Sequence, residues 1–407
     1  MTSIRIDRVG DGPLVLTDPV LGARSVALGV WVGVGSRDEP TERAGVCHFL
    51  EHLLFKGTPR RSALDLARSV ERAGGELDAF TSREHTVLHG RFPARHTELA
   101  VDLLGEVLSE PAFRSADVDL EREVILDELA AAHDVPEDDA YVLLYETLFP
   151  DHGLGRDSLG TAESIERVGR DDIASFFADE FRADRMVVVG AGAVDHDELV
   201  ERLDSVLRVG PANGELHRTA PTPRTGAIVE RRRDCEQGHL LLAWPSPPAG
   251  DDRRHALAVL TQVLGGGAAS RLFQRVREDR GWAYSVYATT AAFSDAGVLI
   301  VGAATAPGRL DGVAEITAAE IDDLRRHGPD ADELATAIGY LAGSAELAAE
   351  DPAARMYGHG MSMLERFVPM DVDADVAALQ AVTAADVAEL ADELFATDPT
   401  RVAVRPS

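Results

Sequence analysis

Residues 165–185, IERVGRDDIASFFADEFRADR, and residues 379–399, LQAVTAADVAELADELFATDP, follow one pattern. A constant offset of 214 residues aligns like with like: Val168 with Val382, Asp172 with Asp386, Phe181 with Phe395, and Asp184 with Asp398. Each copy reads as an amphipathic helix that runs into a terminal β run. Since the offset is about half of the 407-residue chain, the pattern predicts an internal duplication. A coincidence between two amphipathic helices is the alternative.

Strand and helix patterns alternate on both sides of these copies. Apolar and β-branched runs predict strands over 25–34, 76–80, 86–91 and 186–192. Periodic apolar residues predict helices over 42–55, 63–72, 96–108, 115–132, 171–181 and 196–207. Because the second half repeats this plan, we expect an α+β fold of two homologous halves, each a mixed or antiparallel sheet flanked by helices.

A stretch without periodicity separates the two halves. Residues 209–225, VGPANGELHRTAPTPRT, are rich in Pro, Gly and Thr, a composition that favours a linker. The sequence therefore predicts an N-terminal half over 1–208, a linker over 209–228 and a C-terminal half over 229–407. The chain length agrees, because it exceeds one ordinary core and suits two domains of about 200 residues each.

Charge and composition restrict the partners and the compartment. The formal net charge is −30, and Lys56 is the only lysine, so nucleic acid, which needs clustered cations, is excluded as a partner. No apolar run reaches the roughly 18 residues of a membrane helix, so no membrane association is expected. Two cysteines, Cys47 and Cys235, cannot build a disulfide framework. With no signal-peptide pattern, and an Ala-, Gly-, Asp- and Arg-rich composition, we expect a soluble, cytoplasmic, bacterial protein.

The run GVCHFLEHLLFKGT, residues 45–58, contains the pattern HxxEH at His48, Glu51 and His52. On a helix, residues four apart lie on one face, so both imidazoles can reach one ion. Zinc accepts neutral imidazole and carboxylate ligands. Glu51 lies at the edge of that face, where it can reach a water as general base without displacing it. Two ordinary helix histidines are the alternative.

Catalytic zinc usually takes a third protein ligand. The best candidate lies in DLEREVILDELAAAH, residues 119–133, where Glu121 and Glu128 are seven apart and share a helix face. Val124, Ile125 and Leu129 are expected to give this helix an apolar packing surface, among which a carboxylate needs a partner such as a metal. Taken alone, Glu128 reads as a solvated helix residue.

Three motifs together resemble the pitrilysin-type, or inverzincin, metallopeptidases: HFLEHLLFKGT (48–58), LDAFTSREHTVLHG (77–90) and EREVILDE (121–128). The resemblance is greatest to the mitochondrial processing peptidase branch, M16B, and its bacterial relatives. Glu128 lies 76 residues after His52, the spacing at which this family has its third zinc ligand. The resemblance implies one Zn²⁺ per chain, held by His48, His52 and Glu128, with Glu121 as a supporting glutamate behind the ligands.

The resemblance continues in GGGAASRLFQRVREDRGWAYSVYA, residues 265–288. It implies that Arg277 and Tyr284, seven residues apart, hold the substrate near the scissile bond and assist catalysis. Arg280 and Tyr287 have the same spacing. At the duplication offset, the positions that match the three metal ligands are Gln262, Gly266 and Ala342, and no HxxEH occurs in the second half. We therefore expect a metal-free C-terminal half.

The strand segment Asp78, Ala79 and Phe80 resembles the family's β segment that pairs with the substrate backbone. Two positions depart from the family pattern: Asp78 replaces a frequent Asn, and Trp282 replaces a frequent Leu. Neither departure touches the metal set.

The function that the resemblance implies is a zinc endopeptidase that hydrolyses unfolded peptides or short polypeptides inside a closed chamber. Zinc is expected to polarise a water and the substrate carbonyl. Glu51 takes the water proton and later delivers it to the leaving amine. The halves are expected to form a clam shell, and the chain to form a homodimer. A non-catalytic structural or chaperone-like subunit on the same fold is the alternative.

Overall fold

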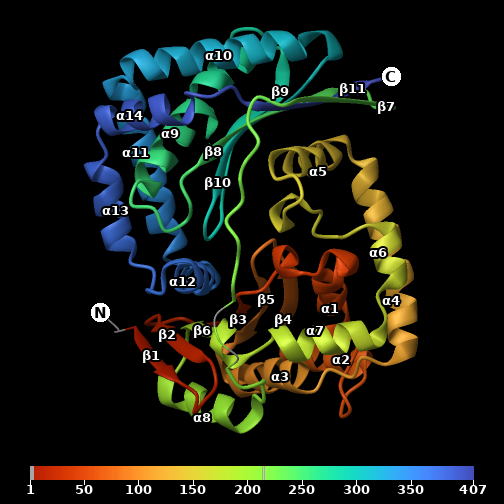
Figure 1. Cartoon of the computed structure of the whole chain (residues 1–407). Helices are drawn as coiled ribbons and strands as arrows, with labels where there is room; N and C mark the ends of the chain where they lie inside the picture. The colour runs from red at the N-terminus through yellow and green to blue at the C-terminus, as the bar shows by residue number, and fades with distance from the viewer. Residues whose placement is uncertain (1–3, 213, 215) are drawn as a thin grey trace. The chain divides into compact units, whose positions relative to one another are not determined.

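Two separate β-sheets organise the chain, and each lies in its own unit (Figure 1). The structure is a computed structural model that describes residues 4–212, 214 and 216–407. The first unit contains Met1–Ala130, Arg156–Thr219 and Ala348–Met370; the second contains Ala131–Gly155, Ala220–Leu347 and Asp371–Ser407. Each unit is therefore assembled from segments that are distant in the sequence.

The sheet of the first unit has the strand order β1-β2-β6-β3-β5-β4. Its strands are β1 (Arg5–Arg8), β2 (Leu14–Pro19), β3 (Ser25–Val32), β4 (Glu76–Thr81), β5 (Thr86–Pro93) and β6 (Met186–Gly192). Only β2 and β6 pair in parallel. The helices that follow these strands are α1 (Val46–Leu54), α2 (Ala63–Ala73), α3 (Thr97–Ser109), α4 (Ser115–Asp134), α6 (Ala162–Arg167), α7 (Arg170–Glu180) and α8 (His196–Val206).

The sheet of the second unit has the order β7-β11-β8-β10-β9. Its strands are β7 (Ile228–Arg233), β8 (Gly238–Ser246), β9 (Ala283–Ala292), β10 (Gly297–Thr305) and β11 (Thr400–Pro406), with β7 and β11 in parallel. Its helices include α9 (Arg254–Gly265), α10 (Leu310–His327), α11 (Ala331–Ala348), α13 (Val372–Ala381) and α14 (Ala384–Leu394).

The duplication predicted from the two helical copies is confirmed by the strand orders. The series β2-β6-β3-β5-β4 in one sheet corresponds to β7-β11-β8-β10-β9 in the other, and each has one parallel pair at the same place. Helices α7 and α14, and strands β6 and β11, begin and end at positions that differ by the same 214 residues. The α+β class is likewise confirmed.

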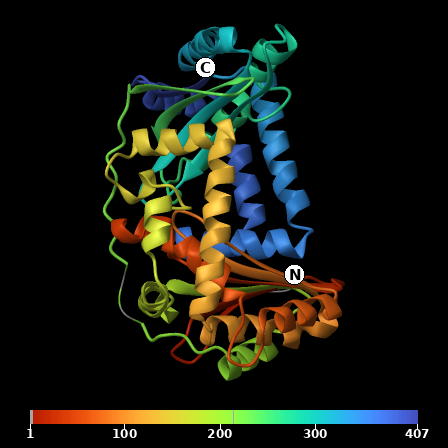
Figure 2. The same cartoon turned by 90° about the vertical axis from the view of Figure 1, so that its right-hand side faces the viewer.

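The two halves exchange one helix, which corrects the contiguous boundaries expected at 1–208 and 229–407. Helix α5 (Pro136–Leu148) belongs to the second unit, where it packs on β8 and β11. Its counterpart, α12 (Pro352–Arg366), belongs to the first unit, where it packs on β3 and β6. Figure 2 shows α12 in blue beside the red and orange strands.

Strand β3 shows why the sheet of the first unit needs helix α12. Side chains alternate between the two faces of a strand, and Val26, Leu28 and Val30 of β3 join the core with helices α1 and α3. The alternate residue Trp31 is fully buried on the other face, under α12. Helix α12 comes so near that a Cβ at Gly360 would lie 2.0 Å from the Trp31 ring. The exchange thus covers a sheet face that would otherwise expose an indole.

A buried ion pair fixes α12 to the first unit. Asp18 on β2 is 1% exposed and accepts hydrogen bonds from Arg355 Nε at 2.5 Å and His359 Nε2 at 2.9 Å. Burial raises the pKa of Asp18, but the bonds from His359 and Arg355 outweigh burial and hold that pKa below its ordinary value. The helix is therefore held by directional contacts as well as by apolar packing.

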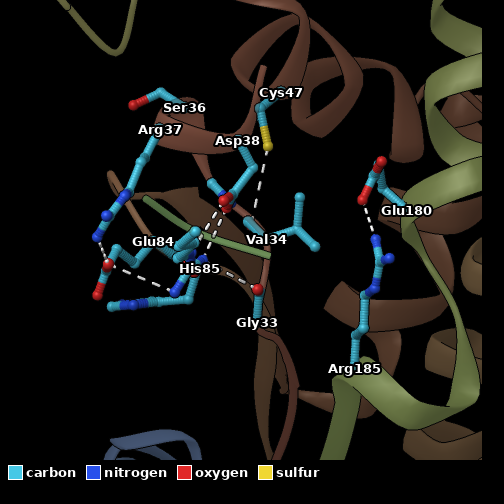
Figure 3. Close-up of polar contacts among 12 residues, drawn as sticks. Gly33, Val34, Ser36, Arg37, Asp38, Cys47, Glu84, His85, Glu180 and Arg185 are labelled. Carbon is cyan, nitrogen blue, oxygen red and sulfur yellow. Dashed lines mark hydrogen bonds and ion pairs between the residues drawn. The ribbon is translucent and has the colours of Figure 1, made fainter. Parts of the chain in front are cut away.

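The predicted linker, of which residues 213 and 215 lie outside the described residues, is anchored at Arg218 and Thr219. Arg218 donates to both carboxylate oxygens of Asp38, at 2.9 and 2.7 Å, and Arg37 donates to the Thr219 carbonyl at 2.7 Å. Figure 3 shows the Arg37 side chain directed at Glu84, with which it pairs at 2.5 Å. The linker therefore belongs to the first unit as far as Thr219.

Across the residues that the structure describes, no helix combines the length and the apolar character needed to cross a membrane.

Candidate metal centre

Helix α1 carries the HxxEH residues because its opposite face is buried in the core. Phe49, Leu50 and Leu53 are fully or almost fully buried in the main cluster of the first unit. A helix anchored along one apolar stripe presents its remaining positions on another face. That face holds His48, Glu51 and His52, of which His48 is 8% exposed.

The imidazoles of α1 meet at their Nε2 atoms, which lie 3.1 Å apart. Glu128 of α4 approaches both: its Oε2 lies 3.4 Å from His52 Nε2, and its Oε1 lies 3.8 Å from His48 Nε2. With Zn–N distances of about 2.0–2.1 Å and tetrahedral geometry, two ligand atoms lie about 3.3 Å apart. The three side chains therefore fit a zinc ion. Within residues 4–212, 214 and 216–407 they are the sole His, Cys, Asp or Glu group with such spacing.

The protonation of His48 also suits a metal ligand. Burial, together with the nearby His52, lowers the pKa of His48 to about 4. At neutral pH His48 is therefore an uncharged imidazole with a lone pair to offer. The Nε2 atoms of His48 and His52 face each other, so a cation between them would be bound favourably.

Glu121 lies behind the ligands and not among them. It is 4% exposed, and its Oε1 lies 3.0 Å from His52 Nδ1. A carboxylate on the far nitrogen orients the ring and fixes which nitrogen carries the proton. The structure thus places Glu121 where the resemblance implied a supporting residue.

The environment of Glu128 differs from the expected one. Its side chain is 45% exposed, and Val124, expected to pack, is 50% exposed, whereas Ile125 and Leu129 are buried. Burial among apolar residues therefore gives no reason for Glu128 to need a partner. That reasoning applies to Glu121, which is buried.

Glu51 has the properties of a general base. Burial raises the pKa of its carboxyl group; the nearby Thr81 hydroxyl and His52 oppose this, while Asp78 and Glu128 add to it. Its Oε2 atom is buried and has no hydrogen-bond partner within the described residues. A buried carboxyl with one open oxygen and a pKa moved toward neutrality is suited to proton transfer.

Glu39 determines where α1 begins. The helix expected over 42–55 is interrupted at Gly45, whose φ of 87° lies in the left-handed region, so α1 starts at Val46. The buried Glu39 carboxyl accepts the N–H groups of Gly45 and Cys47, both at 2.8 Å. These N–H groups would otherwise lack partners at a helix start. Figure 3 shows Cys47 from this first turn, with its sulfur directed toward Val34.

Replacing Glu39 with Gln is expected to remove a pH dependence of stability. Burial raises the pKa of Glu39 to about 8 from the ordinary value of 4.5, despite the two N–H bonds. A raised folded pKa gives stability that is complete below about pH 4.5 and is lost as pH rises through about 8. Glutamine keeps only one of the two acceptor oxygens, a loss that does not depend on pH. In metal-free protein, the stability of wild type relative to Glu39→Gln should therefore fall by at least about 1.4 kcal/mol between pH 5 and pH 8.5, the equivalent of one pKa unit.

Urea unfolding of both proteins across this pH range measures the difference. Glu42→Gln, an exposed glutamate in the turn before α1, is the control and should follow wild type at every pH. A stability difference between wild type and Glu39→Gln that stays constant from pH 5 to pH 8.5 would contradict the prediction.

The expected substrate segment lies on the outermost strand of the sheet. Strand β4 pairs with β5 on one side, and the strand order ends with β4 on the other. Phe80 stacks on Tyr357, with ring centroids 6.0 Å apart, while Ala79 packs toward the main core. A cavity of about 590 Å³ runs beside this strand, lined among others by Phe55, Leu66, Val70, Leu77, Asp78 and Met356.

The expected substrate pair, Arg277 and Tyr284, lies in the second unit. The Arg277 guanidinium carbon lies 5.0 Å from the centre of the Tyr284 ring, which is 80% exposed. The alternative pair is not brought together: Arg280 lies over Trp282, and the Tyr287 hydroxyl bonds to Glu137 and Tyr141. Arg277 sits in a short π-helical segment, Phe273–Glu278, a feature frequent at functional sites.

Two residues that the structure places next to the proposed metal centre were not predicted from the sequence. Glu39 caps α1 from six residues before Gly45, and Lys56 contacts Glu121. No spacing rule connects either residue to a metal motif. The one available signal was that Lys56 is the only lysine of the chain.

Family models match two consecutive parts of the chain. The model described as insulinase, peptidase family M16, matches residues 15–162, and the model described as peptidase M16 inactive domain matches residues 167–341. The first match contains all the proposed metal ligands. The second contains Gln262 and Gly266, the positions that the duplication matches to the two histidines.

Curated relatives are similar along almost their whole length. A protein of Streptomyces coelicolor named an uncharacterized zinc protease is 36% identical, over 99% of this chain and 90% of its own. Proteins with the same description from Mycobacterium tuberculosis and Bacillus subtilis are 40% and 33% identical, each over 94% of this chain and over 89% and 94% of their own.

Solved structures share the fold. A crystal structure described as a peptidase M16 inactive domain from Pseudomonas fluorescens has a TM-score of 0.91 at 20% identity, covering 100% of this chain and 98% of its own. A protease from Helicobacter pylori has a TM-score of 0.93 at 19% identity, covering 99% of both chains.

Proposed function

Because this chain belongs to the M16 family of peptidases, we propose that it is a zinc-dependent endopeptidase acting on unfolded peptides or short polypeptides. The observation that carries the proposal is the convergence of His48 Nε2, His52 Nε2 and a Glu128 carboxylate oxygen within 4.8 Å of one another. Two imidazoles and one carboxylate leave a position open at the metal, as catalytic zinc sites do.

The chemistry divides between the metal and Glu51. When bound, zinc supplies a Lewis acid that polarises a peptide carbonyl and acidifies a water. His48 and His52 offer imidazole nitrogens, and Glu128 offers a carboxylate oxygen. Glu51, whose pKa is raised by burial, accepts the proton of the attacking water and then donates it to the leaving amine.

Strand β4 is the proposed seat of the substrate backbone. An extended peptide can add to an outermost strand through main-chain hydrogen bonds, while its alternate side chains enter pockets. Backbone groups of successive strand residues alternate between the two edges, so those among Asp78, Ala79 and Phe80 that do not pair with β5 would provide these bonds. Thr81 ends the same strand, and its hydroxyl is near enough to Glu51 to oppose the rise in the pKa of that carboxyl, so a peptide on β4 would run toward the proposed base.

Arg277 and Tyr284 are proposed to hold the substrate from the metal-free half. Their mutual contact and the exposure of Tyr284 support this role. The homodimer, the closed chamber and the cytoplasmic location remain predictions from the sequence. Light scattering tests the dimer: a fully active monomer at every concentration would contradict it.

A non-catalytic subunit is the second candidate function, because the similar Pseudomonas fluorescens structure is described as an inactive domain. In the present chain, however, all three proposed ligands and the proposed base are present, and the three ligand atoms lie close together, which supports the zinc site. The zinc peptidase is therefore the better supported function.

Cleavage of a pool of unfolded peptides, read by mass spectrometry, tests the proposal. Wild type with zinc is expected to cut several peptides, to stop after a chelator is added, and to recover when zinc is restored. A zinc-loaded wild type that cuts none of them would favour the non-catalytic function.

A further inference from the structure

Lys56 occupies a place next to the metal centre that the proposed chemistry leaves unexplained. It follows α1 directly, and its ammonium group pairs with Glu121 Oε2. The other oxygen of the same carboxylate, Oε1, lies 3.0 Å from His52 Nδ1. One carboxylate thus bridges the only lysine of the chain and a proposed metal ligand.

Burial makes this ion pair different from an ordinary surface pair. Exposed pairs contribute little, because water solvates both partners. The Glu121 side chain is only 6% exposed, while that of Lys56 is 39% exposed. A carboxylate withdrawn from water needs a partner of opposite charge. Without Lys56, the Glu121 carboxylate has an energetic reason to move away from the position that serves His52.

The main chain around Lys56 is held in place. Its own N–H donates to the Leu53 carbonyl at 3.1 Å, and its carbonyl accepts from Arg114 at 3.2 Å. Arg114 also donates to the Thr58 carbonyl at 2.8 Å. The ammonium therefore extends from a fixed point toward Glu121, as a positioning role requires.

The residue type is itself informative. The chain has 40 Lys and Arg residues, of which Lys56 is the only lysine. An ammonium is a compact point charge with three rotatable donors, whereas a guanidinium is a planar fork of larger size. Arginine serves at every other cationic position, and the exception is the position that faces the carboxylate behind His52.

We propose that Lys56 is a positioning residue of the metal centre: its ammonium holds the Glu121 carboxylate against His52 Nδ1, and this contact keeps His52 Nε2 directed at the ion. The inference rests on the proposed zinc site. It assigns Lys56 no contact with the substrate or with the reacting atoms.

Zinc affinity, measured by competition with a chromophoric chelator, tests the proposal without using peptidase activity. Lys56→Met is expected to bind zinc about 10–100-fold more weakly than wild type, the usual effect of losing a partner behind a ligand. Its Co²⁺ complex should show a changed visible spectrum, because one imidazole is less well oriented. Arg68→Met, at an exposed arginine on α2 of the same unit, is the matched control and should bind like wild type.

A second measurement avoids any question of folding in the variant. Apart from the amino terminus, Lys56 carries the only amine of the chain, so amine reagents can alter it in folded, metal-free wild type. Acetylation, which removes the charge, is expected to weaken zinc binding about 10-fold or more. Reductive methylation, which keeps the charge, is expected to leave zinc binding within about 2-fold of untreated protein. Mass spectrometry reports the extent of each reaction.

The outcomes separate this inference from the proposed function. Zinc affinities of Lys56→Met and of acetylated protein that equal the Arg68→Met value would overturn the role of Lys56. A wild type that binds zinc but cuts no peptide would overturn the peptidase and leave the Lys56 result valid. A wild type that binds no zinc would overturn both.

Discussion

Glu51→Gln is expected to bind zinc as wild type does and to hydrolyse peptides about 10³-fold more slowly, within the range usual for loss of a general acid–base group. Glutamine has the same shape as glutamate but cannot accept the proton of the attacking water. Glu51 is not among the three side chains whose ligand atoms converge, so the metal should remain. This combination of retained zinc and lost turnover distinguishes a base from a ligand.

Single-turnover cleavage of a susceptible peptide, with zinc content measured on the same sample, checks this expectation. Glu123→Gln, on the exposed side of α4, removes the same charge and should keep wild-type turnover. A Glu51→Gln variant with wild-type turnover would remove Glu51 from the mechanism; one that lost its zinc would make Glu51 a ligand or its support.

Glu128→Ala is expected to lose the metal and, with it, the activity. The carboxylate supplies one of three protein ligands and the only negative charge among them. The affinity for zinc should fall by more than about 100-fold. A loss of about 100-fold is already the upper end when only a residue that hydrogen-bonds to a ligand is removed. The side chain is 45% exposed, so its truncation should cost little packing energy, and the metal-free variant should unfold at the same urea concentration as metal-free wild type.

Elemental analysis and chelator competition measure the loss, with Glu123→Gln again as the control on the same helix. Stoichiometric zinc of wild-type affinity in Glu128→Ala would show that another residue completes the site. His48→Ala is a less clean test, because His48 is largely buried and its removal would also leave a cavity.

Helix α1 shows which features a local sequence pattern can predict and which it cannot. The HxxEH spacing placed two imidazoles on one face of a helix, and the structure brings their Nε2 atoms to 3.1 Å. The expected helix nevertheless began too early. The start of α1 depends on the left-handed Gly45 and on the Glu39 carboxyl, which accepts an N–H bond in the first turn from six residues earlier. Periodicity carries no information about such a cap.

Helix α4 shows the opposite case. Glu121 and Glu128 were placed correctly on one face, but the expectation that Val124 packs was wrong. An isolated helix pattern does not say which apolar residues its neighbours will cover. Only the packing of α4 decides that Glu121 is buried behind His52 while Glu128 stays half-exposed beside the metal position.

The duplication and the two-sheet α+β plan could be predicted from local pattern, because a repeated pattern of apolar residues must bury two similar cores. Spacing along one helix likewise determined His48, Glu51 and His52 as a set. The tertiary structure alone decided the exchange of α5 and α12, the cap by Glu39 and the contact between Lys56 and Glu121. The helix exchange and the contact between Lys56 and Glu121 join residues far apart in the chain, and the Glu39 cap reaches across six and eight residues through a turn. Such contacts depend on which surfaces meet once the sheets have formed, which local periodicity does not record.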